Sequence, residues 1–119
     1  MTNHEPFAAR QVRAAVSESA SRDENERTDD PSGASELTHY TCECAHECAA
    51  LVSLTNDEYE DVRRVPTHFL AAPSHLVVGV EVVVRETSRY LVVEKIGAAA
   101  PVAATLDPRG KTLRRPRAA

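Results

Sequence analysis

LTNDEYEDVRRVP, residues 54–66, carries the clearest structural signal in this chain of 119 residues. Thr55 followed three residues later by Glu58 is the pattern of a capping box, in which each side chain binds the other residue's backbone N–H. Pro66 disfavours helical geometry in the residue before it. We therefore predict a capped helix over residues 55–65.

Short β-prone segments lie on both sides of this helix. Residues 39–44 and 50–54 would pair as a hairpin, and residues 68–71 are extended. Residues 80–85 and 90–95 are rich in valine and are separated by a four-residue connection, which predicts a second hairpin. The predicted fold class is α+β: a small cysteine-bearing hairpin, one capped helix and a C-terminal hairpin around a zinc site.

We expect the compact α+β unit to occupy residues 37–106, because the flanking regions are poor in large apolar residues. Within residues 1–36 we predict a weak N-terminal helix before residue 20. A disordered acidic linker is predicted over residues 19–36, since a polar stretch buries too little surface to offset the entropy of ordering it. Residues 107–119 are predicted to form a flexible basic tail.

Charge and hydropathy restrict the classes of partner. The net charge is −4, and residues 37–106 hold nine acidic and five basic side chains. An acidic body disfavours nucleic-acid binding, which needs clustered Lys and Arg. The sequence shows no signal-peptide pattern and no apolar run long enough to span a bilayer. We therefore expect a cytoplasmic protein without membrane contact.

Three cysteines fall within seven residues. Cys42 and Cys44 are two positions apart, so on a strand their sulfurs would point to the same face. Cys48 follows after a short turn. An odd cysteine count without a signal peptide favours thiols or a metal over disulfides. Zinc commonly takes three Cys and one His as a structural set, so we predict a structural zinc site. Redox-active thiols and inert buried thiols are the alternatives.

The fourth zinc ligand could be any of four histidines: His39, His46, His68 or His75. We select His75, because it lies in a loop far enough beyond the helix for the chain to return to the hairpin. His46 lies within the cysteine segment and would be strained. On a strand, the side chain of His39 would point to the face opposite to that of Cys42. His68 follows the end of the helix too closely for the chain to return to the hairpin.

Further motifs accompany the cysteines: Cys42-Glu43-Cys44 with Cys48, Leu54-Thr55 with Glu58-Tyr59-Glu60 and Val62-Arg63, Pro66-Thr67-His68-Phe69-Leu70, the His75 loop, Tyr90-Leu91-Val92-Val93-Glu94-Lys95, and Asp107-Pro108-Arg109. Together they resemble a set of small uncharacterised actinobacterial-type proteins, over roughly residues 38–109. In that set the loop histidine usually follows Gly and precedes an acidic residue, whereas Ser74 and Leu76 flank it here. The resemblance implies a metal site but no activity.

A closed Cys3His set leaves no coordination position for a substrate, so it favours a structural role over zinc hydrolysis. We therefore predict a small zinc-stabilised binding or adaptor module with a protein partner that the sequence does not identify. The alternative is a thiol-based redox sensor that uses Cys42, Cys44 and Cys48. No residue constellation in the sequence indicates an enzyme.

Overall fold

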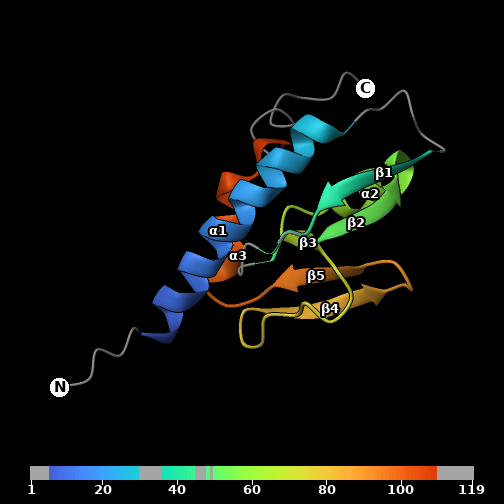
Figure 1. Ribbon diagram of the computed structural model, residues 1–119. Coiled ribbons are helices and arrows are strands. Elements are labelled where there is room, and N and C mark those ends of the chain that lie inside the picture. The colour runs from blue at the N-terminus through green and yellow to red at the C-terminus, as the bar shows by residue number, and fades with distance from the viewer. Residues whose placement is uncertain (1–5, 30–35, 45–47, 49, 110–119) are drawn as a thin grey trace.

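The computed structural model describes residues 6–29, 36–44, 48 and 50–109. In chain order the elements are α1 (Phe7–Thr28), β1 (Leu37–Thr41), β2 (Leu51–Thr55), α2 (Asn56–Arg63), β3 (His68–Ala71), β4 (Glu81–Glu86), β5 (Leu91–Lys95) and α3 (Ala99–Leu106) (Figure 1). β1 and β2 form an antiparallel two-stranded sheet. The other three strands form an antiparallel sheet in the order β3-β5-β4. The α+β prediction and both predicted hairpins are therefore confirmed.

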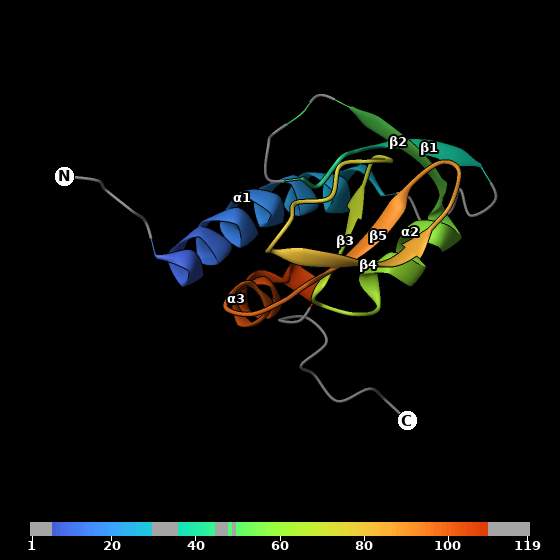
Figure 2. The same cartoon turned by 90° about the horizontal axis from the view of Figure 1, so that it is seen from below.

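The helices pack on the two sheets from different directions. α1 and α3 lie side by side, and Figure 2 shows both at the same end of the molecule, beside the strands. α2 instead packs against β2 and β3. The main core lies between these elements and is built largely from aliphatic side chains with a few aromatic rings. In it the rings of Tyr40 and Tyr59 stack with their centroids 4.4 Å apart.

The capping box predicted for α2 is present. The Glu58 backbone N–H donates to the Thr55 side chain, and the Thr55 backbone N–H donates to the Glu58 carboxylate. Leu54, just before the cap, and Tyr59, in the first turn of the helix, are fully buried, so the start of α2 is packed into the core on both sides of the cap. The helix ends at Arg63, slightly before the predicted end.

The N-terminal helix departs most from the sequence-based prediction. The predicted disorder over residues 19–36 is wrong for residues 19–28, because α1 is continuous from Phe7 to Thr28. Residues 30–35 lie outside the described part of the chain. The buried side chains of α1 recur every three or four residues: Gln11, Ala15, Glu18, Ser19, Arg22 and Asn25. Most of them are polar, so the sequence shows no apolar stripe at this spacing.

Hydrogen bonds explain how a polar helix face is buried. The Arg22 guanidinium donates to the carbonyls of Pro66 (2.8 Å) and Ala103 (2.9 Å). The Asn25 amide donates to the Thr41 carbonyl and accepts the Thr41 N–H, both at 2.8 Å. A buried polar group costs little when its hydrogen bonds are made. α1 is therefore attached by specific polar contacts in place of a wide apolar surface.

The C-terminal segment begins as an ordered element. We predicted a flexible tail from Asp107 onward, but Asp107 is buried. Arg109 binds Glu60 through both terminal nitrogens (2.8 and 2.7 Å) and Glu26 through Nε (2.8 Å). This guanidinium links α1 to α2, so the prediction is wrong at the start of the segment. Residues 110–119 lie outside the described part of the chain.

Candidate metal centre

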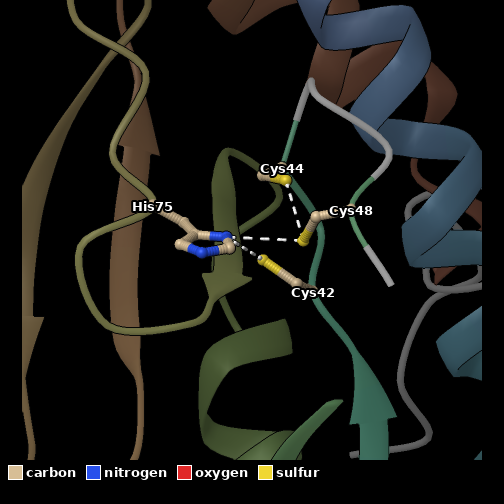
Figure 3. A group of neighbouring side chains, drawn as sticks. All are labelled: Cys42, Cys44, Cys48 and His75. Atoms are coloured by element: carbon tan, nitrogen blue, oxygen red, sulfur yellow. Dashed lines mark hydrogen bonds between the residues drawn. The ribbon is translucent and has the colours of Figure 1, made fainter. Parts of the chain in front are cut away.

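Three segments of the chain bring three thiols and one imidazole together (Figure 3). Cys42 and Cys44 follow β1, Cys48 lies in the connection to β2, and His75 lies in the connection between β3 and β4. Their ligand atoms all lie within 4.8 Å of one another. The four residues predicted as a Cys3His set are therefore adjacent in the structure.

The distances within this group fit a four-coordinate ion. His75 Nδ1 lies 3.5 Å from Cys42 Sγ and 3.4 Å from Cys48 Sγ, and the Sγ atoms of Cys44 and Cys48 are 3.4 Å apart. Tetrahedral zinc, with Zn–S near 2.3 Å and Zn–N near 2.0 Å, places neighbouring ligand atoms roughly 3.5–3.8 Å apart. The Cys44–Cys48 separation is longer than a disulfide, and no disulfide joins the described cysteines. The donor set thus has the dimensions of a metal site.

A tight turn delivers His75 to the thiols. The His75 N–H donates to the Ala72 carbonyl at 3.1 Å, which closes a four-residue turn. Pro73 occupies the second position and Ser74 the third, where φ is 71°. Proline followed by a residue of positive φ is the signature of a type II turn. In the same turn the Ala72 N–H donates to Cys42 Sγ at 3.2 Å, so one turn both places His75 beside the thiols and donates a hydrogen bond to one of them.

Burial divides the four donors into two pairs. Cys42 and Cys44 are each 1% exposed, whereas Cys48 and His75 are partly exposed. Burial raises the pKa of the Cys42 thiol well above its ordinary value. A bound divalent cation has the opposite effect, because a thiol that coordinates it is deprotonated. A metal ion bound here would therefore have to deprotonate thiols that burial keeps neutral.

Glu43, between Cys42 and Cys44, is a site residue that the sequence reasoning missed. Its backbone N–H donates to the Leu70 carbonyl, and its carboxylate accepts the Leu70 N–H, both at 2.8 Å. The same carboxylate accepts a 2.7 Å hydrogen bond from the Asn25 amide. Burial raises its pKa. The alternation of side chains along a strand could have indicated this role, because a residue between two cysteines that face the same side points to the opposite side.

The other histidines have different surroundings. His39 Nδ1 lies 3.0 Å from the Ser53 hydroxyl on the exposed side of the β1–β2 hairpin. His68 Nε2 lies 4.0 Å from a Glu94 carboxylate oxygen. His46, which we had rejected as a ligand, lies outside the described residues. Of the histidines that the structure describes, His75 is the one placed among the thiols.

Comparison with known proteins finds no matching family model, no matching curated protein and no matching solved structure. Among the described residues, no helix combines the length and the apolarity needed to cross a membrane. The resemblance noted above therefore remains a prediction.

Proposed function

We propose that Cys42, Cys44, Cys48 and His75 bind one zinc ion. Convergence of all four donor atoms within 4.8 Å is the observation that carries this proposal. Thiolates and imidazole favour zinc over hard cations such as magnesium or calcium, which take oxygen ligands. Four protein ligands complete the tetrahedral shell and leave no position for water, so the zinc ion has a structural role.

The position of the site explains what the ion would stabilise. The three cysteines lie in the connection between β1 and β2 of the first sheet, and His75 belongs to the turn that follows β3 of the second sheet. An ion held by both would fix one sheet against the other. The core contains few aromatic side chains, and small domains with modest cores commonly depend on a metal or a disulfide.

We further propose that the stabilised unit is a binding or adaptor module for a protein. Val82, Val83 and Val84 on β4 are 44%, 41% and 44% exposed, and β4 is an outer strand of its sheet. An edge strand offers unpaired backbone groups to a partner chain. Capture of a partner by the parent protein and its loss with Val83→Lys would support this role; capture that is unaffected by Val83→Lys would argue against β4 as the binding surface.

Metal content tests the zinc site directly. Native mass spectrometry of the purified protein should give about one zinc per chain, lost in His75→Ala and Cys48→Ser. His68→Ala is the matched control and should retain zinc, because His68 lies away from the thiols. Chelation should lower the melting temperature of the parent protein. A metal-free parent that melts at the same temperature with and without chelator would overturn the proposal.

The contact between Cys44 and Cys48 favours one second function, a thiol-based redox sensor. Their sulfurs are already adjacent, so a modest side-chain rotation would bring them to bonding distance. Native mass spectrometry of the zinc-loaded protein after mild oxidation distinguishes the structural site from the redox sensor. A purely structural site keeps its zinc, whereas a sensor releases it with formation of a disulfide.

A further inference from the structure

A groove of about 530 Å³ opens beside the thiol cluster. One wall is the exposed side of α1, where Ser17, Ala20 and Ser21 are small. The other wall includes Thr41 and Cys48. Of the three thiols, Cys48 is thus both the most exposed and the one that borders an open space large enough for a small molecule.

We propose that Cys48 is the thiol through which low-molecular-weight disulfides oxidise this site, and that Cys44 is its resolving partner. The proposal deepens the second function proposed above, the redox sensor, and rests on the proposed metal site, because it states how a Cys3His site would be dismantled. In thiol–disulfide exchange the attacking thiolate must approach the disulfide in line with its S–S bond, so the rate depends strongly on the exposure of the attacking thiol. Cys42 and Cys44 are almost fully enclosed, whereas the groove gives a small disulfide access to Cys48.

The exchange proceeds in two steps. In the first step, the Cys48 thiolate attacks one sulfur of the small disulfide, the S–S bond breaks, and one small thiolate leaves. A mixed disulfide now joins Cys48 to the other half of the reagent. In the second step, the Cys44 thiolate attacks the sulfur of Cys48 and releases the second small thiolate. The protein has lost two electrons to the reagent, which is reduced to two thiolates.

Geometry selects Cys44 over Cys42 as the resolving thiol. The sulfurs of Cys44 and Cys48 are 3.4 Å apart. Cys42 Sγ also lies within 4.8 Å of Cys48 Sγ, but it accepts the Ala72 N–H at 3.2 Å and lies 3.5 Å from His75 Nδ1. Once Cys44 and Cys48 are joined, two of the four ligands are no longer available, and the remaining pair cannot complete a tetrahedral site.

Oxidised glutathione is the probe for this proposal. After treatment of the zinc-loaded full chain, peptide mapping of the parent should find a Cys44–Cys48 disulfide, with complete loss of zinc. Cys44→Ser should instead accumulate glutathione on Cys48. In Cys48→Ser, glutathione should modify Cys44 more slowly, by about tenfold or more, than it modifies Cys48 in Cys44→Ser, because access limits the exchange. Cys42→Ser, which also lacks a ligand but keeps both reacting thiols, should still form the disulfide.

A second pair of variants tests the groove without touching a ligand. Ala20→Phe would narrow the groove from an exposed helix position and should slow modification of Cys48 several-fold. Ala8→Phe, on an exposed position of α1 outside the groove, should leave the rate unchanged. Equal rates in the two variants would show that the groove is not the path of entry and would overturn the proposal.

The outcomes separate this proposal from the metal site itself. If the parent binds zinc but is modified first at Cys42 or Cys44, or resists oxidised glutathione, the metal site stands and the present proposal fails. If the parent binds no zinc, the metal site fails. The order of modification in the metal-free chain then still decides between Cys48 and its neighbours.

Discussion

Ser74 has a backbone geometry that its side chain makes unfavourable. Its φ of 71° lies in the left-handed region, where residues with a Cβ are disfavoured and glycine is not. The conformation persists because the type II turn requires it and because His75 must reach the thiols. A strained residue next to a ligand indicates that the position of the ligand determines the backbone here.

Ser74→Gly should therefore stabilise the protein, by up to about 1 kcal/mol, because it removes the strain. Ser74→Ala is the control: it keeps the Cβ and should give no stabilisation. Urea denaturation midpoints of the two variants measure the difference. A lower midpoint for Ser74→Gly than for Ser74→Ala would mean that the turn is not strained at this position.

The site residues show what sequence reasoning reaches and what it misses. His75 was predictable, because a helix length and a count of extended residues limit where the chain returns. Glu43 was not predicted as a positioning residue, because its partners Leu70 and Asn25 lie on elements whose contact depends on the tertiary fold. Local spacing thus finds the four clustered residues, whereas the residue that holds Cys42 and Cys44 in place depends on long-range packing.

α2 was predicted with its correct start because every signal for it is local. Thr55 and Glu58 satisfy each other's backbone N–H groups within four residues of chain. We expect Thr55→Ala to destabilise the protein by about 1 kcal/mol, the usual loss for an N-cap. Thr38→Ala, on the neighbouring strand β1, serves as a control outside the cap. An unchanged denaturation midpoint for Thr55→Ala would contradict the contribution of the capping box.

α1 was predicted poorly because its signal is not local. Hydrophobic periodicity identifies a helix by an apolar face, and the buried face of α1 carries Gln11, Glu18, Arg22 and Asn25. Their partners are backbone carbonyls and charged groups that only the folded chain supplies. Read by composition, such a segment cannot be distinguished from a disordered one.

Removing one of these partners should be costly. Asn25→Ala removes two hydrogen bonds to the half-buried backbone groups of Thr41 and one hydrogen bond to the buried Glu43 carboxylate. We expect a loss of about 2–4 kcal/mol, since each unsatisfied buried group costs about 1–3 kcal/mol. Glu24→Ala, on the exposed side of the same helix, should change stability by at most about 0.5 kcal/mol. Similar midpoints in a urea titration of the two variants would show that the polar face does not hold α1.

Three buried charged groups join the helical and sheet parts of the protein. The Lys95 ammonium on β5 contacts both the Glu18 carboxylate of α1 and the Glu81 carboxylate of β4, and all three side chains are inaccessible to solvent. Two carboxylates then share one cation. Burial raises the pKa of Glu81 from its ordinary value of 4.5 to about 7.

This raised pKa predicts how stability changes with pH. Between pH 4.5 and about 7 the folded state holds a proton on Glu81 that the unfolded state has released, so stability falls as the pH rises. Burial also lowers the pKa of the neighbouring Lys95 to about 7, and this titration is present in both proteins. Glu81→Gln removes the titration of Glu81, so its stability relative to the parent should rise from pH 4 to pH 8. Glu86→Gln, exposed on the same strand, is the control. Parallel stability curves for the parent and Glu81→Gln would contradict the assignment.

The attachments of α1 also have a consequence for synthesis on the ribosome. Gln11 accepts the backbone N–H of Ala98, 87 positions later, and Arg22 binds the Ala103 carbonyl, 81 positions later. At about 5–20 residues per second, the helix is synthesised roughly 4–16 s before these partners. An apolar helix would expose a surface prone to aggregation during that interval. A helix whose contact face is largely polar can remain hydrated until the C-terminal half of the chain arrives.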